Sequence, residues 1–423
     1  MFTNTYLPHV GGVARSVSTF EEQLRRQGHN VCVIAPEFDG AEASPHVLRM
    51  PALQNFNGSD FSVRLPQPGL IAEFLDEFKP QVLHSHHPFL LGDSALRAAW
   101  TRRLPLVFTH HTLYEQYTRY VPLDSDAMKR VAIQMATEYC NLCTHVIAPS
   151  ESVATLLMER CVKTPITAAP TGIDLELFGG GDGAVFRKRH GIDQSALVVG
   201  HVGRLAGEKN LEYLAKAVGR LLAERSDAVF LVVGTGEFSD RVREIAAESA
   251  KPSQVVMAGQ QSGQDLADAY AAMDLFAFSS QSETQGMVLA EALAARTPVV
   301  ALDGPGVREV VSDKNGRLLS ADVTEAEFAS ALSKLANDRD ATRRLGETAR
   351  RSAEPFGVEA CTARLLGVYD RLIGEYQDRE EADPGLWDRF LSRLEIEWNL
   401  LVEKTTAISA AVVETDATRN QLD

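Results

Sequence analysis

The sequence is short of cysteine, tryptophan and positive charge. Its 423 residues include 5 cysteines and 3 tryptophans, and 42 Lys and Arg face 57 Asp and Glu, for a formal net charge of -15. Nucleic-acid binding through phosphate contacts needs a surplus of cations, so we expect no nucleic-acid partner. The odd number and scattered positions of the cysteines fit reduced thiols in a reducing compartment.

Long apolar runs are absent as well. The sequence contains no run of 18 apolar residues, the length that could span a bilayer. The first residues lack the basic stretch and apolar core of a signal peptide. We therefore expect a cytoplasmic protein. Apolar residues nevertheless make up 45% of the chain, which is enough material for two hydrophobic cores.

Short apolar runs alternate with amphipathic helical segments, a pattern typical of a parallel sheet covered on both faces. A glycine-rich segment at residues 178–185 divides the runs into two sets, and we interpret it as a flexible linker or surface loop. We predict two doubly wound α/β domains, residues 1–172 and 173–355, with ligands bound beyond the carboxyl ends of the strands. The runs are VCVIAP, PQVLHSH, PLVFTHH, THVIAPS, ALVVGHVGR, AVFLVVGTG, QVVMAG, DLFAFSS and TPVVALDG.

Two helical segments are expected at the C-terminal end. Apolar residues lie on one face of residues 358–375, which predicts a helix that covers a surface of the protein. From Trp387 to Ile408 apolar residues alternate four and three apart, a stripe that would pack on the chain itself or form a homodimer contact. We favour packing. Residues 376–423 are acidic, the wrong sign for binding anionic lipid.

Two loops carry residues suited to a phosphorylated ligand. In PHVGGVARSV, Gly12 would let the backbone approach a ligand closely at the start of a helix. After the run ALVVGHV, Arg204 and Lys209 place two cations on one loop before a helix that begins near Asn210. A diphosphate there would receive directed hydrogen bonds from Arg204 and a compact charge from Lys209.

A third loop, SETQGMVLAEALA, joins the runs DLFAFSS and TPVVAL. It places Glu283 before a predicted helix at residues 285–295 and Glu291 inside that helix. Leu289 and Leu293 point to the core, whereas Glu291 is expected on roughly the opposite, exposed face. The backbone amides of residues 284–287 would face the same crevice as the cationic loop. A purely structural alternative is a capping box formed by Ser282 and Gln285.

Three patterns could suggest a metal site, and none is favoured. Asp124-Ser125-Asp126 is a DxD, but it precedes a helical segment and suits helix capping. Cys140 and Cys143 fall where a predicted helix runs into a strand, which favours a packing role. A cluster of histidines lacks the paired helical or cysteine spacing of zinc sites. The histidines of this cluster are His84, His86, His87, His110 and His111. We therefore expect neither a metal nor a cofactor.

In their order, these motifs resemble the retaining glycosyltransferases of family 4, which have the GT-B fold. The resemblance covers most of residues 1–375, through MFTNTYLPHVGGV, HSHHP, FTHHTLYEQY, PTGID, VGRLAGEKN, VVGTG, SETQGMVLAEALA and GVREVV. It implies two Rossmann-like domains that face a central cleft, with residues 356–375 forming a helix that returns to the N-terminal domain. A nucleotide-sugar donor would bind mainly to the C-terminal domain and the acceptor mainly to the N-terminal domain.

The resemblance also implies roles for individual residues. Arg204 and Lys209 correspond to the pair that binds the donor diphosphate, Glu291 to the ribose contact and Glu283 to the glutamate near the donor sugar. His111, rather than His110, corresponds to the histidine that contacts the donor sugar, and Arg204, Lys209, Glu283 and His111 form the expected catalytic set. The remaining donor contacts would be Gly12, Thr284, Gln285, Gly286 and Met287.

For the acceptor, HTLYEQYTRYVP together with SETQG resembles the bacterial branch that glycosylates diacylglycerol, with UDP-glucose as donor. Tyr114 and Tyr117 are the expected acceptor contacts, and a lipid acceptor implies peripheral contact with the inner face of the membrane. Four alternatives stay open: a small soluble acceptor, a nucleotide-sugar epimerase, a non-catalytic nucleotide-sugar sensor, and a glycoside hydrolase with Glu283 and Glu291 as acid and base.

Two positions depart from the family pattern. PTGID has Thr171 where the family usually has asparagine, and Arg296 stands where a helix-ending glycine is usual. The arginine is expected to cost some stability at the end of that helix without touching the chemistry.

Overall fold

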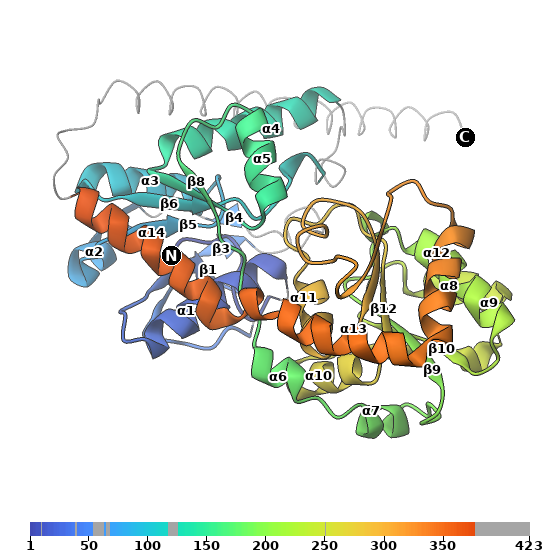
Figure 1. The fold of residues 1–423 in the computed structure, drawn as a ribbon. Helices are drawn as coiled ribbons and strands as arrows, with labels where there is room; N and C mark the ends of the chain where they lie inside the picture. The colour runs from blue at the N-terminus through green and yellow to red at the C-terminus, as the bar shows by residue number, and fades with distance from the viewer. Residues whose placement is uncertain are drawn as a thin grey trace, which may run out of the picture.

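The computed structural model describes residues 1–9, 11–38, 40–53, 63–64, 68–116, 126–249 and 251–376. These residues form two α/β lobes, each with a parallel sheet between helices (Figure 1). The GT-B fold class predicted from the sequence is confirmed. Tyr117, the DxD residues Asp124 and Ser125, and the heptad stripe with its homodimer alternative lie outside the described residues.

The sheet of the first lobe is assembled around Phe2. Phe2 makes parallel bridges to Ile34 on one side and to Ser85 on the other, so it joins the pair β1–β2 to the row β5–β6–β7–β8. The N-terminal strand is thus a single bridging residue. The strands are β1 (Val33–Pro36), β2 (Val47–Met50), β5 (Leu83–Ser85), β6 (Leu106–Thr109), β7 (His145–Ala148) and β8 (Ile166–Ala168), and a separate antiparallel pair joins β3 (Ala52–Leu53) to β4 (Val63–Arg64).

Helices pack around this first sheet. They are α1 (Gly12–Arg26), α2 (Pro68–Phe78), α3 (Leu91–Arg102), α4 (Asp126–Leu142) and α5 (Glu151–Glu159), with the short helix η2 (Tyr114–Gln116). Cys140 lies in the last turn of α4 and Cys143 directly after it; both are buried and free, and burial raises the pKa of the Cys140 thiol to about 12. Their predicted packing role is confirmed.

The second sheet has six parallel strands in the order β11-β10-β9-β12-β13-β14. This order reverses between β9 and β12, and doubly wound sheets bind ligands at such a switch point. The strands are β9 (Leu197–Val202), β10 (Ala228–Val233), β11 (Val255–Gly259), β12 (Leu275–Phe278), β13 (Val299–Leu302) and β14 (Gly316–Leu319). The main helices of this lobe are α8 (Leu211–Glu224), α9 (Ser239–Ser249), α10 (Gly263–Ala271), α11 (Met287–Ala294), α12 (Glu325–Asn337) and α13 (Arg339–Ser352).

The glycine-rich segment 178–185 is a packed connection at the surface, which corrects the alternative of a flexible linker. It joins the end of α6 (Leu175–Gly179) to the start of α7 (Gly183–Arg189). A Cβ on Gly181 would lie 2.3 Å from the carbonyl oxygen of Ala267, and one on Gly183 would lie 2.2 Å from that of Ala271. These glycines let the chain pack directly on the backbone of α10, so their clustering reflects close packing.

The last described helix returns to the first lobe. After α13 and the short helix η6 (Glu354–Phe356), α14 (Val358–Tyr376) runs beside α1 (Figure 1). Its apolar face joins a core with residues of α1 and of the sheet, which are Phe20, Leu24, Val107, Ile147 and Ala169. The predicted helix is therefore confirmed, and the surface it covers is the first sheet. None of the described helices is long and apolar enough to span a membrane.

Gly234 and Gly367 provide a test of this packing. Gly234 follows β10 with φ +134, and a Cβ there would lie 1.9 Å from the carbonyl oxygen of Gly203, whereas a Cβ on Gly367 in α14 would meet nothing within 4 Å. We expect Gly234→Ala to destabilise the protein by about 2–4 kcal/mol and Gly367→Ala to stabilise it by about 0.5–1 kcal/mol. Denaturant unfolding measures both, and equal stability of the two variants would contradict the close approach.

Candidate active site

The cationic loop and the SETQG turn follow the two strands that flank the switch point. Residues after β9 and after β12 are cross-linked, since Ser279 Oγ donates to the carbonyl oxygens of Lys209 (3.1 Å) and Asn210 (3.0 Å). Ser282 Oγ donates to the carbonyl oxygen of Glu208 at 3.2 Å. The two loops therefore form one rigid unit at the carboxyl edge of the sheet.

Both predicted phosphate ligands lie on this unit, and both are paired with carboxylates. Arg204 forms an ion pair with Glu208 and keeps 53% of its side chain exposed. Lys209 Nζ lies 2.6 Å from Oε1 of Glu283, and both side chains are largely buried. A bound diphosphate would compete with Glu283 for Lys209, so the two residues assigned to phosphate and to sugar are coupled before any ligand binds.

The SETQG turn begins α11 through Gly286. Gly286 is the N-cap residue with φ +71, and the helix starts at Met287. The capping-box alternative is wrong, because Ser282 binds the cationic loop and Gln285 turns to the other lobe. Gln285 accepts from the amide of Thr171 at 2.8 Å and donates to its carbonyl oxygen at 2.6 Å. The amides at the start of α11 give this turn the positive end of a helix.

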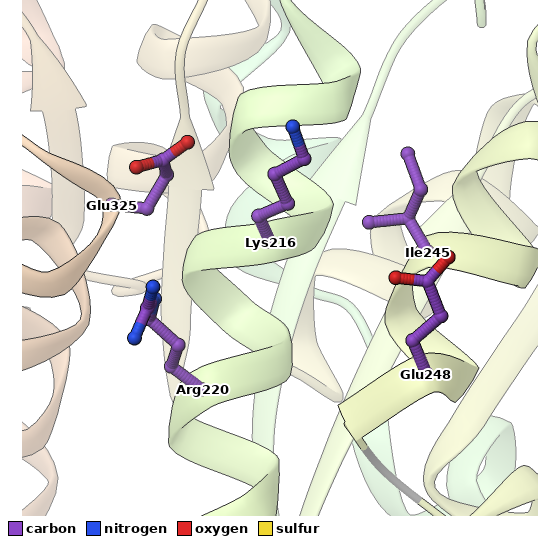
Figure 2. Close-up of a pocket in the computed structure, with 5 residues that line it drawn as sticks. All are labelled: Lys216, Arg220, Ile245, Glu248 and Glu325. Carbon is purple, nitrogen blue, oxygen red and sulfur yellow. The ribbon is translucent and has the colours of Figure 1, made fainter.

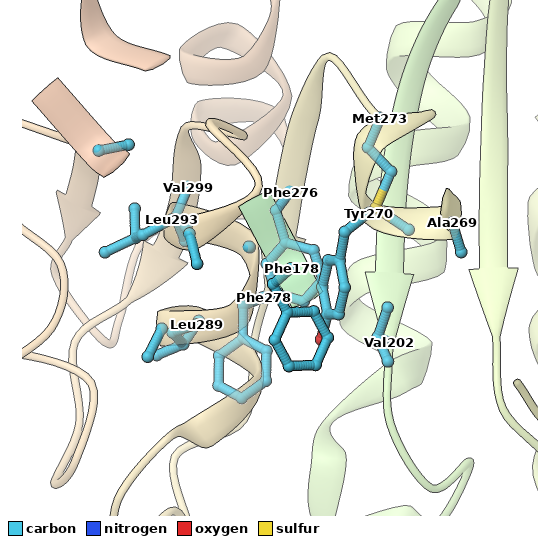
Figure 3. Packing of buried hydrophobic residues seen from close by; sticks show 14 of the residues in the cluster. Phe178, Val202, Ala269, Tyr270, Met273, Phe276, Phe278, Leu289, Leu293 and Val299 are labelled. Carbon is cyan, nitrogen blue, oxygen red and sulfur yellow. The ribbon is translucent and has the colours of Figure 1, made fainter. Parts of the chain in front are cut away.

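Glu291 is fully buried, which corrects the prediction of an exposed residue. Leu289 and Leu293 reach the core as expected. On the other face of α11, Glu291 Oε2 accepts from the hydroxyl of Tyr270 at 2.7 Å, and Oε1 lies 2.6 Å from Nη2 of Arg15. Figure 3 shows Tyr270 within the core beside Phe178. Helical periodicity identified a second face, but not the packing of α10 and α1 against it.

Arg15 is a site residue that sequence reasoning missed. It lies in the first turn of α1, three residues after Gly12, and reaches across from the first lobe to Glu291. Gly12 itself starts α1 with open space in front of its Cα. The only signal in the sequence for Arg15 was its place on the helix that follows the paired glycines. A buried carboxylate needs a cationic partner, and here the other lobe supplies it.

His111 brings the first lobe to the same site. Thr284 Oγ1 donates to the carbonyl oxygen of His111 at 3.0 Å, which joins the SETQG turn to the end of β6. The ring of His111 contacts His86, with 2.9 Å between His111 Nε2 and His86 Nδ1. Burial lowers the pKa of His111 to about 3 and that of His110 to about 4, so both rings are neutral near pH 7.

Tyr114 lies among aromatic residues of the first lobe. Its ring meets the ring of His110 at a centroid distance of 5.7 Å and that of Phe89 at 5.6 Å, both edge to face. The structure thus places Tyr114 near the histidines, whereas its predicted acceptor contact stays a prediction. Within the described residues, no group of three or more His, Cys, Asp or Glu is arranged to hold a metal ion.

A groove of about 230 Å³ lies elsewhere, between α8, α9 and α12 (Figure 2). It is lined by Lys216, Arg220, Ile245, Glu248 and Glu325. The charges of both signs offer no net field for a ligand, and the first lobe contributes nothing to it. It therefore stands apart from the site between the lobes.

Comparison with known proteins assigns the family. Residues 10–177 match the model for Glycosyltransferase Family 4, and residues 183–352 match that for Glycosyl transferases group 1. A GDP-mannose-dependent alpha-mannosyltransferase of Mycolicibacterium smegmatis is 30% identical over 88% of this chain and 96% of its own length. The chain belongs to glycosyltransferase family 4.

One further relative and one solved structure are similar to this glycosyltransferase. The alpha-monoglucosyldiacylglycerol synthase of Streptococcus pneumoniae is 28% identical over 74% of this chain and 73% of its own length. Among solved structures, the sucrose-phosphate synthase of Thermosynechococcus elongatus superposes with a TM-score of 0.71 and 20% identity, over 88% of this chain and 99% of that one. The structural likeness supports the GT-B fold.

Proposed function

We propose that this glycosyltransferase moves a hexose, with retention of anomeric configuration and without a metal ion, from a nucleoside diphosphate sugar to a hydroxyl acceptor. The observation that carries the proposal is the meeting of four features at one switch point: Arg204, Lys209, the positive end of α11 and the carboxylate of Glu291. They suit a ligand with a diphosphate and a diol, and the diol would reach Oε1 of Glu291 by displacing the half-exposed Arg15. His111 joins this unit from the other lobe, because its carbonyl oxygen accepts from Thr284.

The charges fit the chemistry of a glycosyl-phosphate bond that breaks. Negative charge grows on the leaving diphosphate, where Arg204, Lys209 and the amides of α11 would stabilise it without a metal. Positive charge grows on the sugar, near Glu283. Retention can follow front-face attack, with the leaving phosphate accepting the acceptor's proton, or a covalent intermediate on a nucleophile of the protein. Mass spectrometry of the enzyme trapped with a slow donor separates these routes.

The cations beside the two glutamates weigh against the hydrolase alternative. A hydrolase of this kind uses a pair of catalytic carboxyls, one of them as a proton donor. Here each glutamate is paired with a cation, Glu291 with Arg15 and Glu283 with Lys209. Cations at this edge serve a phosphorylated donor and have no task with a neutral sugar chain.

For the donor we propose UDP-glucose, with GDP-mannose as the second candidate. The relative from Streptococcus pneumoniae is named for glucosyldiacylglycerol, and the one from Mycolicibacterium smegmatis for GDP-mannose. For the acceptor we propose diacylglycerol, which would place the enzyme at the cytoplasmic face of the membrane. A small soluble hydroxyl compound is the alternative.

The proposal predicts donor turnover in the presence of a chelator. UDP-glucose and GDP-mannose are each incubated with the enzyme in EDTA, with vesicles that do or do not contain diacylglycerol, or with soluble polyols, and nucleotide and glycoside products are measured. We expect nucleotide release that depends on the acceptor and an α-linked product. Release without acceptor would indicate hydrolysis, and sugar inversion at another carbon would indicate an epimerase. Loss of activity in EDTA would contradict metal independence.

A further inference from the structure

The ring of His111 is held by a second histidine that has no assigned role. His86 follows β5, is fully buried, and donates its backbone N–H to the carbonyl oxygen of Phe2 at 2.9 Å. Its Nδ1 lies 2.9 Å from Nε2 of His111, and the two ring centroids are 5.2 Å apart at an interplanar angle of 24°. This short contact requires a proton between the two nitrogens.

The direction of that hydrogen bond follows from the other nitrogen of His86. His86 Nε2 is buried and has no hydrogen-bond partner among the residues that the structure describes. Burial lowers the pKa of His86 well below its ordinary value, so each ring carries one proton. If His111 donated through Nε2, the proton of His86 would sit on Nε2 as a buried N–H without an acceptor. If His86 donates through Nδ1 instead, its Nε2 carries a lone pair that no donor meets. A buried acceptor without a donor costs less free energy than a buried N–H without an acceptor.

His86 in turn is fixed by His84. The rings of His84 and His86 lie 4.1 Å apart between centroids. His84 is anchored at both nitrogens, with Nδ1 2.5 Å from the hydroxyl of Tyr369 in α14 and Nε2 2.7 Å from Oγ1 of Thr109 in β6. His86 therefore lies between a ring that cannot turn and the ring of His111.

We propose that His86 is a positioning residue, which donates from Nδ1 to Nε2 of His111 and so keeps the proton of His111 on Nδ1. That nitrogen is not engaged by His86 and can donate to a hydroxyl of the donor sugar. The catalytic consequence rests on the proposed function, whereas the tautomer of His111 does not. The tautomer can therefore be tested on the ligand-free protein.

The first test is a long-range 1H–15N correlation spectrum of the full chain labelled with 15N-histidine, with His111→Gln to assign the signals. We expect His111 as the Nδ1–H tautomer in the native protein. In His86→Phe, which keeps a buried ring but has no donor, we expect the Nε2–H tautomer or a mixture. An Nε2–H tautomer of His111 in the native protein would overturn the proposal.

The second test compares His86→Phe with His86→Asn in the transfer assay. An asparagine amide can occupy the position of Nδ1 and donate to His111, although the ring is lost. We expect His86→Phe to lower kcat about tenfold with unchanged affinity for the nucleoside diphosphate. We expect His86→Asn to keep most of the native kcat. A role in packing alone predicts the reverse order, with His86→Asn the less active and less stable variant.

The two tests separate failure of this inference from failure of the proposed function. If the native protein shows the Nδ1–H tautomer but turns over no nucleotide sugar, the positioning contact stands and the function is wrong. If transfer is observed and both His86 variants match the native kcat, the function stands and the positioning role is overturned.

Discussion

Arg204→Ala is expected to lower the transfer rate about a hundredfold and to abolish tight binding of the nucleoside diphosphate. The guanidinium is half exposed at the switch point, where it pairs with Glu208, and a guanidinium can bind a phosphate through directed hydrogen bonds. A preorganised contact to a leaving group contributes on the order of 3 kcal/mol to lowering the barrier. Calorimetric titration with UDP and GDP, together with initial rates, measures both effects.

Arg343→Ala is the matched control for Arg204→Ala. Arg343 is also an exposed arginine paired with a carboxylate, Asp340, but it lies in α13, which packs against Arg296 after the C-terminal end of α11. We expect this variant to bind nucleotide and to turn over like the native enzyme. Equal affinity of native protein and Arg204→Ala for UDP and GDP would refute the diphosphate site.

Glu291→Gln and Glu283→Gln are expected to separate donor binding from turnover. Glu291 is buried with Tyr270 and Arg15, so the amide leaves Arg15 without its counter-charge and replaces one of the two proposed acceptor oxygens for the ribose hydroxyls by a donor. We expect loss of donor binding and a destabilisation of about 1 kcal/mol, because the half-exposed Arg15 can be solvated. Glu283→Gln should keep nucleotide binding and lose most turnover, because Glu283 is the residue that we propose to face the donor sugar.

Arg15→Gln provides the control for the stability effect. It removes the same ion pair from the exposed partner, whose loss leaves the Glu291 carboxylate in place for a ribose. If Arg15→Gln destabilises the protein as much as Glu291→Gln yet still binds nucleotide, the binding loss belongs to the carboxylate. Donor binding retained in Glu291→Gln and lost in Glu283→Gln would reverse the two roles.

The strands and the fold class could be predicted from the sequence. Runs such as ALVVGHV and DLFAFSS became β9 and β12 because a strand buried on both faces must be apolar along its whole length. The strands β2, β8 and β14 were missed. They are short and only partly buried, so their sequences VLRM, ITA and GRLL lack the continuous apolar signal.

The effect of one departure from the family pattern could also be predicted from the sequence. Arg296 was expected to end α11 in place of glycine, and it adopts φ +61, the left-handed conformation that glycine favours. Thr171 in place of asparagine had no such local signal. Its hydroxyl lies 2.6 Å from Oγ of Ser16 in α1, a contact between segments far apart in the chain.

The sequence by itself determined the two parallel sheets, the returning helix and the loops that carry Arg204, Lys209 and Glu283, because these depend on local periodicity and on strand ends. Only the tertiary structure decided the state of the site: Glu291 buried against Arg15 of the other lobe, Lys209 paired with Glu283, and His86 directed at His111. Each of these contacts joins residues distant in sequence. Their partners are chosen by how the lobes and helices pack, which no local pattern encodes.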